Sequence, residues 1–226
     1  MSDQPSARET KLPDHLLEGY QAFVASRLPD EQARFRQLAE RGQRPKVMLI
    51  GCCDSRVPPE VIFGAGPGEL FVVRNVANLV PTYGPDANQH GTSAALEFGV
   101  MGLRVEHVVV MGHAQCGGVR SYVENEVDPY ARPLSAGDFI GQWMTLIKPA
   151  ASRLGKPAGP TADFVELLAK ESVRQSLDNL RTFPWIKTLE ERRNLSLHGA
   201  YFGVADGQLQ VLDEATGLFS PVFAAF

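Results

Sequence analysis

The stretch Val47-Met48-Leu49-Ile50-Gly51-Cys52-Cys53-Asp54-Ser55-Arg56 joins an unbroken apolar run to a group of reactive side chains. The run over 47–52 is apolar at every position rather than at alternate ones, which is typical of a parallel strand covered on both faces. A second stretch, His107-Val108-Val109-Val110-Met111-Gly112-His113-Ala114-Gln115-Cys116, has the same organisation. Each stretch therefore predicts a buried strand that ends in candidate metal ligands or nucleophiles.

Further elements alternate along the chain with these two strands. We expect a strand at 70–74, and two more at 195–204 and 208–213, joined by Asp206-Gly207, which favours a hairpin. Helices are expected at 89–103, 117–125, 138–152, 161–181 and 184–192. This alternation predicts an α/β fold with a central, mostly parallel β-sheet flanked by helices. The sheet would have about four parallel strands plus an antiparallel edge strand.

The first 41 residues have a different pattern. Residues 1–11 are polar and predict a loose tail, and helices are expected at 14–28 and 30–41 with a break at Pro29. One apolar stripe at helical spacing contains Leu16, Leu17, Tyr20, Phe23 and Val24. We therefore expect a single domain over 1–226, with a helical arm at 1–41 and an α/β core at 42–226.

Composition excludes several classes of protein. The chain has 226 residues and a formal net charge of -4, so it lacks the basic surplus of a general nucleic-acid binder. No apolar run approaches the roughly 18 residues of a membrane span, and the N-terminus lacks the apolar segment of a secretory signal. We therefore expect a cytoplasmic protein with neither nucleic acid nor membrane as a partner. Its three cysteines cannot form a disulfide framework.

Candidate ligands follow two of the expected strands. Cys52 and Cys53 come at the end of the first, and His113 and Cys116 at the end of the third. In open α/β sheets, ligands bind outside the carboxyl ends of the strands at the switch point. Thiolate and imidazole are preferred zinc ligands, and a set of Cys52, His113 and Cys116 would leave the fourth position open, which is the catalytic pattern.

Two charged residues stand next to these ligands. Asp54 could take the fourth position or lie beside it, and Arg56 could hold its carboxylate through a bidentate ion pair. A thiol redox site is the main alternative to a metal site. Against it, the adjacent pair Cys52-Cys53 lacks the C-x-x-C spacing of common dithiol enzymes.

Three blocks, residues 52–58, 67–78 and 112–119, resemble the β-class carbonic anhydrases in composition and order. The resemblance extends from about residue 42 to residue 213. It implies a zinc-dependent lyase, a carbonic anhydrase, that reversibly hydrates carbon dioxide to bicarbonate and a proton. It also implies a homodimer or homotetramer. The helical arm would wrap a partner subunit through its apolar stripe; the alternative is that the stripe packs on its own subunit.

The resemblance assigns roles at the metal. One Zn²⁺ per chain would lie on Cys52, His113 and Cys116, with water or hydroxide at the fourth position in the open form. In the closed form Asp54 ligates the zinc, whereas in the open form Arg56 pairs with Asp54.

Further positions carry over by the same resemblance. The substrate pocket would contain Gln43, Phe71, Val76 and Phe98, together with the backbone N–H of Gly117. Cys53 stands where the family usually has Ser or Ala, so we expect a bystander that points into the core.

The family also divides by a non-catalytic bicarbonate pocket built from a Trp, an Arg and a Tyr, here Leu49, Arg74 and Phe202. Only the Arg is retained, which implies an open site without the bicarbonate switch. Other functions stay open: hydrolysis of carbonyl sulfide or carbon disulfide on the same ligand set, a zinc protein without activity in which Asp54 closes the site, and a thiol redox protein.

Overall fold

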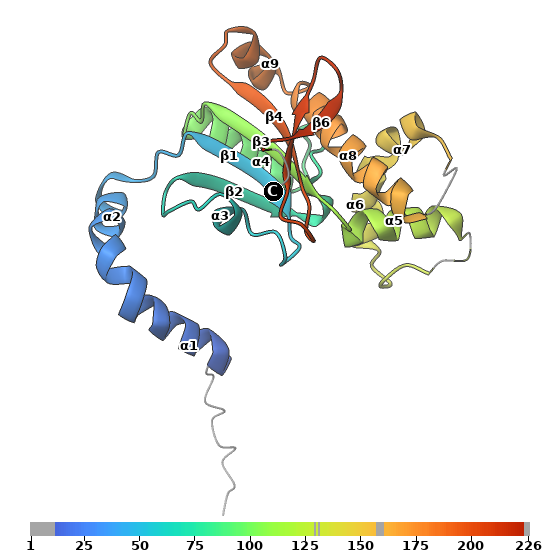
Figure 1. The fold of residues 1–226 in the computed structure, drawn as a ribbon. Coiled ribbons are helices and arrows are strands. Elements are labelled where there is room, and N and C mark those ends of the chain that lie inside the picture. The colour runs from blue at the N-terminus through green and yellow to red at the C-terminus, as the bar shows by residue number, and fades with distance from the viewer. Residues whose placement is uncertain (1–11, 129, 131, 157–160, 224–226) are drawn as a thin grey trace, which may run out of the picture. The chain divides into compact units, whose positions relative to one another are not determined.

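The computed structural model describes residues 12–128, 130, 132–156 and 161–223 (Figure 1). Contacts between residues separate the chain into two units, with the boundary between Gln43 and Arg44. The expected loose tail at 1–11 lies outside the described residues. No helix in the described ranges has the length and apolar character of a membrane span.

Residues 14–41 of the N-terminal unit are continuously helical, and the predicted break at Pro29 is wrong. Helix α1 (Asp14–Ala22) runs into a π-helical turn η1 (Phe23–Arg27) and then into α2 (Leu28–Arg41). Pro29 lies in the first turn of α2, directly after the π-helical turn, and the helical backbone continues through it.

The helix of this unit bends between Phe23 and Phe35. The rings of Phe23 and Phe35 meet edge-on with centroids 6.0 Å apart. A straight helix would separate the backbone at these positions by about 18 Å, so the contact between the two long side chains requires the helix to bend between them. The stripe residues Leu16 and Tyr20 remain largely exposed in this unit.

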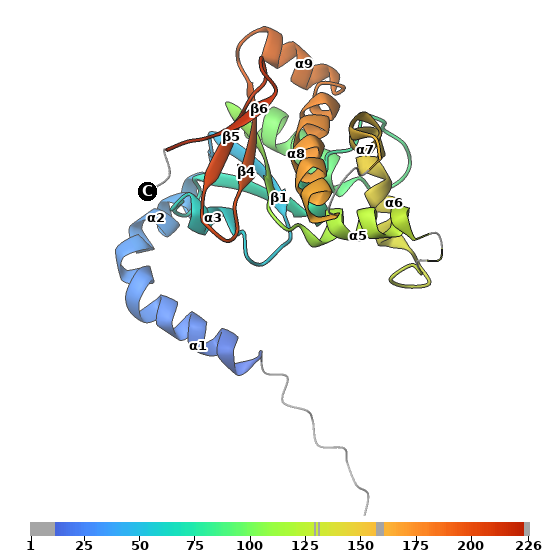
Figure 2. The same cartoon turned by 45° about the vertical axis from the view of Figure 1, so that its right-hand side comes forward.

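The second unit contains one sheet with the strand order β2-β1-β3-β4-β5-β6 (Figures 1 and 2). The strands are β1 (Val47–Cys52), β2 (Leu70–Asn75), β3 (His107–His113), β4 (Ser196–Phe202), β5 (Leu209–Asp213) and β6 (Leu218–Pro221). The first four are parallel, as predicted, and β5 pairs antiparallel with β4. β6 was not predicted, because a four-residue strand with exposed ends carries no clear alternation.

The helices match the predicted ranges with local changes. They are α3 (Pro59–Ile62), α4 (Gly91–Glu97), α5 (Gly117–Val127), α6 (Phe139–Met144), α7 (Lys148–Leu154), α8 (Thr161–Leu180) and α9 (Pro184–Glu191). Three irregular turns accompany them: η2 (Val76–Asn78), η3 (Phe98–Gly102) and η4 (Thr145–Ile147). The helix predicted at 89–103 thus ends in a π-helical turn, and the one predicted at 138–152 is interrupted by η4. One-turn α3 was missed.

The main core lies on one face of the sheet. Met48, Ile50, Val108 and Val110 are buried there against residues of α4 and α8, and α8 crosses this face (Figure 2). The opposite face carries a smaller cluster around Leu49, Met111 and Ala200, to which only α3 among the described helices contributes. The chain leaves β1 toward β2 on one side and returns to β3 on the other. The switch point therefore lies between the ends of β1 and β3.

Candidate metal centre

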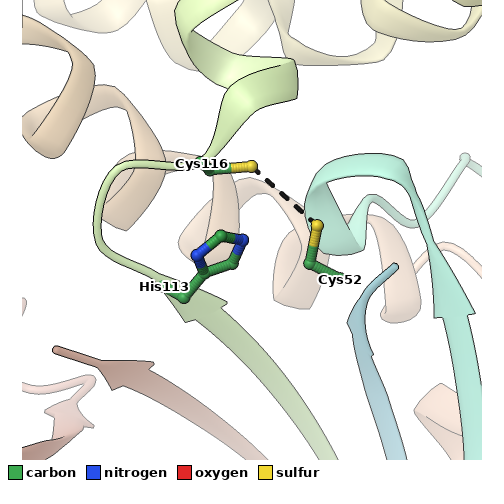
Figure 3. A group of neighbouring side chains, drawn as sticks. All are labelled: Cys52, His113 and Cys116. Atoms are coloured by element: carbon green, nitrogen blue, oxygen red, sulfur yellow. Dashed lines mark hydrogen bonds between the residues drawn. The ribbon is translucent and has the colours of Figure 1, made fainter. Parts of the chain in front are cut away.

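Three potential metal ligands converge at this switch point (Figure 3). Cys52 is the last residue of β1, His113 is the last residue of β3, and Cys116 precedes α5 as its N-cap. All three are buried, and their ligand atoms lie within 4.8 Å of one another. The structure thus brings together the set that the sequence predicted.

The donor geometry fits a tetrahedral zinc ion. The Sγ atoms of Cys52 and Cys116 are 4.0 Å apart. Two thiolates bound to one zinc at about 2.3 Å and a tetrahedral angle are separated by about 3.8 Å. The two sulfur atoms therefore already have the spacing that a shared zinc ion requires.

The imidazole of His113 supplies the third donor. Its Nδ1 lies 2.9 Å from the carbonyl oxygen of Ala114, so we assign the ring proton to Nδ1 as the donor of that bond. This tautomer leaves a lone pair on Nε2, which is buried without any hydrogen-bond partner. A buried polar atom without a partner is costly, and a metal ion at this position would satisfy it.

The two thiols differ in their affinity for a proton. A hydrogen bond from Cys116 lowers the pKa of Cys52 to about 4. The same bond and burial raise the pKa of Cys116, because a second negative charge beside the first is unfavourable. A divalent cation between the sulfurs removes this penalty and favours two thiolates.

Asp54 and Arg56 form the expected ion pair beside the ligands. The guanidinium donates from Nε to Oδ1 at 2.9 Å and from its terminal nitrogen to Oδ2 at 2.7 Å. A further bond joins the guanidinium to the carbonyl of Gln115, 3.1 Å away. The hydrogen bonds from Arg56 hold the pKa of Asp54 well below its usual range. Oδ2 of Asp54 is 3.9 Å from Nε2 of His113, so the carboxylate borders the centre.

The expected pocket residues fall into different places. Gly117 is exposed at the start of α5, directly after a ligand, and Val76 lies at the start of η2 near the same helix. Phe71 and Phe98 contact each other with ring centroids 5.8 Å apart. Phe71 precedes the ligand-bearing end of the sheet by four strand residues, about 13 Å. Phe71, and Phe98 beside it, therefore lie away from the metal ligands of this chain. Gln43 belongs to the N-terminal unit.

The predicted burial of Cys53 is wrong. Its side chain is exposed, although its backbone N–H pairs with the carbonyl of Asn75 at 2.9 Å. Successive side chains of an extended chain point to opposite faces. Because Cys52 faces the buried ligand cluster, its neighbour faces away from it.

Arg74 has a structural partner in this chain. Its guanidinium donates to the carbonyl of Cys52 at 2.8 Å and to that of Asp54 at 2.6 Å. It thereby fixes the backbone that carries a ligand and the acidic residue. Leu49 is buried, and Phe202 is half-buried.

One contact at the centre was not found from sequence. The backbone N–H of Ala77 donates to Sγ of Cys52 at 3.4 Å, and Ala77 has a left-handed conformation with φ 63°. A positive φ is rare for alanine, so neither its residue type nor its spacing pointed to this role.

Comparisons with known proteins agree with this geometry. A family profile described as carbonic anhydrase matches residues 47–209. The chain is 35% identical over 196 residues to β carbonic anhydrase 5, chloroplastic, of Arabidopsis thaliana. It is 34% identical over 197 residues to a carbonic anhydrase of Synechococcus elongatus. These alignments cover 85% and 86% of this chain, and 62% and 69% of the two relatives.

Solved structures give the same result. The β-carbonic anhydrase CcaA has a TM-score of 0.81 at 28% identity, covering 93% of this chain and 92% of that one. A tetrameric β-carbonic anhydrase of Sordaria macrospora has a TM-score of 0.73 at 27% identity, covering 92% and 98%. The chain belongs to the β-class carbonic anhydrases. Zinc is the cofactor of this family, and the Cys-His-Cys cluster fits it.

Proposed function

We propose that this protein reversibly hydrates carbon dioxide to bicarbonate and a proton, with one zinc ion per chain held by Cys52, His113 and Cys116. The observation that carries the proposal is the buried, partnerless Nε2 of His113 beside two thiols, all within 4.8 Å. The family assignment supports the same reaction.

The residues around the cluster suit this chemistry. Zinc, when bound, supplies the Lewis acidity that makes water nucleophilic near neutral pH. Asp54, ionised and fixed by Arg56, accepts a hydrogen bond from the attacking water and orients it toward the carbon atom. The bond between Arg56 and the carbonyl of Gln115 anchors this pair to the segment that carries the other two ligands.

The substrate is small and apolar, and bicarbonate is an anion. Val76 offers an apolar surface next to the start of α5, and the N–H of Gly117 lies at the positive end of that helix, which favours an anion. The roles of Gln43, Phe71 and Phe98 in the pocket stay predictions. So does a location in the cytoplasm, since one relative is named as chloroplastic.

We further propose that the site works in the open form without a bicarbonate switch. The ion pair of Asp54 with Arg56, and the engagement of Arg74 by two backbone carbonyls, support this form. The test is stopped-flow carbon dioxide hydration at pH 7 and pH 8.5, with zinc measured on the same sample. Turnover at both pH values with about one zinc per chain is expected. Activity at the higher pH alone would show that Asp54 closes the site, and a fully loaded but inactive protein would refute the proposed reaction.

We propose a homodimer or homotetramer in which the N-terminal helix contacts a partner subunit. The stripe residues Leu16, Tyr20 and Val24 are exposed at four-residue spacing on α1 and η1. Their triple replacement by Ser should lower the mass measured by light scattering, whereas Glu18→Ser with Gln21→Ser on the same stretch should not. Equal masses for the two variants would refute the role of the stripe.

A further inference from the structure

We infer that Asn75 and Trp143 are positioning residues for the metal centre, because together they fix the turn whose backbone N–H holds the sulfur of Cys52. The inference rests on the metal site of the proposed function. It identifies the side chains that hold in place the backbone N–H donating to the sulfur of Cys52.

The turn η2 has an unusual backbone. Ala77 and Asn78 have φ values of 63° and 48°, so two successive residues other than glycine occupy the left-handed region. Both residues are buried. This conformation directs the N–H of Ala77 at Sγ of Cys52, 3.4 Å away. Such a backbone persists only where its surroundings hold it in place.

The side-chain amide of Asn75 closes the turn. Its Oδ1 accepts a bond from the N–H of Leu79 at 2.9 Å, and its Nδ2 donates to the carbonyl of Leu79 at 2.8 Å. A third bond reaches Oγ1 of Thr92 at 3.2 Å. One side chain thus satisfies both backbone groups of the residue that ends the turn. The carbonyl of Asn75 also pairs with the N–H of Cys53, so the turn is joined to the end of β1.

Trp143 fixes the first residue of the turn. Its indole Nε1 donates to the carbonyl of Val76 at 2.8 Å, reaching across from α6. On the other side, Gly118 lets the turn approach α5 closely, since a Cβ there would lie 2.7 Å from Val76 and 3.4 Å from Ala77. The peptide unit whose carbonyl accepts the bond from Trp143 is the same one whose N–H contacts Cys52.

A hydrogen bond to a thiolate withdraws charge from sulfur and changes what the sulfur donates to a metal. Groups that contact metal ligands commonly change metal affinity by 10–100-fold when they are removed. If Asn75 only stabilised a loop, its loss would lower the melting temperature and leave the sulfur–metal bond as it was. Metal affinity and a sulfur–metal spectrum therefore separate the two roles.

The test compares Asn75→Ala and Trp143→Phe with a matched control, Asn179→Ala. Asn179 also donates a buried amide bond to this loop, to the carbonyl of Val80 at 2.7 Å, but outside the closed turn. Zinc affinity is measured by chelator competition, and the sulfur-to-cobalt charge-transfer band is recorded on cobalt-loaded protein. Asn75→Ala should bind zinc about tenfold more weakly or worse, with the band at longer wavelength.

Trp143→Phe should also weaken zinc binding and move the charge-transfer band to longer wavelength, but less than Asn75→Ala does. This variant keeps the aromatic packing and removes one hydrogen bond. Asn179→Ala should keep the wild-type affinity and band. Unchanged affinity and band in both Asn75→Ala and Trp143→Phe would overturn the inference, as would an equal shift in Asn179→Ala. If Asn75→Ala does not fold, Trp143→Phe decides alone. Failure of the wild-type chain to bind zinc would instead refute the proposed function on which the inference rests.

Discussion

Replacing Gly118 by alanine should disturb the contact between α5 and the turn η2. A Cβ built on Gly118 would lie 2.7 Å from Cγ1 of Val76, 3.4 Å from Cβ of Ala77 and 3.6 Å from Sδ of Met144. A carbon–carbon approach of 2.7 Å is not tolerated, and the branched side chain of Val76 has few other rotamers. The carbonyl of Val76 is also held by Trp143, so the turn cannot move freely.

The size of the effect follows from these contacts. Overpacking of this kind costs about 1–3 kcal/mol, and the better helix propensity of alanine returns up to about 1 kcal/mol. A net loss of about 1–2 kcal/mol corresponds to about 2–8 °C in melting temperature for a chain of this length. The neighbouring Gly117 is a matched control, because no atom lies within 4 Å of its Cβ position.

Thermal unfolding of both metal-free variants tests this reasoning. Gly118→Ala should melt several degrees below the wild type, whereas Gly117→Ala, which gains helix propensity without a clash, should melt at or slightly above it. Because the displaced turn carries the N–H that contacts Cys52, Gly118→Ala should also bind zinc more weakly. Equal stability of the two variants would refute the close contact between η2 and α5.

Three further predictions concern the metal site. Metal analysis should find that Cys116→Ser no longer binds zinc stoichiometrically, whereas Cys53→Ser retains one zinc per chain. The reason is that Cys116 is a buried member of the ligand cluster and Cys53 is exposed outside it. Equal losses of zinc in the two variants would contradict the ligand assignment. Zinc at a hundred times its dissociation constant should stabilise the folded chain by about 2.7 kcal/mol. Removing the zinc with a chelator should therefore lower the melting temperature by about 5–11 °C. An unchanged melting curve would count against a bound metal. Arg56→Gln should destabilise the metal-free protein most above about pH 5, and the difference in stability from the wild type should shrink toward pH 3. The reason is that Arg56 lowers the pKa of Asp54 in the folded protein. The stabilisation from this ion pair is therefore present above the unfolded pKa near 3.9 and is lost as the pH falls. Denaturant titrations at several pH values measure this difference, and a difference independent of pH would contradict the pairing.

The ligand set could be predicted because local and global rules agree there. The unbroken apolar runs before Cys52 and His113 identify central parallel strands, and neighbouring parallel strands bring their carboxyl ends together. Cys116 follows His113 by three residues, so its position was fixed by the same strand end. The two strands occupy the positions that their patterns predicted, at Val47–Cys52 and His107–His113.

Other features depend on context that a single sequence does not display. Pro29 is a breaker by its chemistry, but it was tolerated in the first turn of a helix. The exposure of Cys53 depends on which face its neighbour occupies at the end of β1. The left-handed Ala77 is held by Asn75 and Trp143, and the contribution of Trp143 comes from an element far along the chain.

Zinc K-edge X-ray absorption of the metal-loaded protein tests the central claim most directly, because it reports the number and type of ligand atoms. We expect two sulfur atoms at about 2.3 Å, from Cys52 and Cys116, with two nitrogen or oxygen atoms at about 2.0–2.1 Å, one of them from His113. Three sulfur ligands would mean that Cys53 joins the centre, and a single sulfur would mean that the two buried cysteines do not share the metal. Either result would contradict the site described.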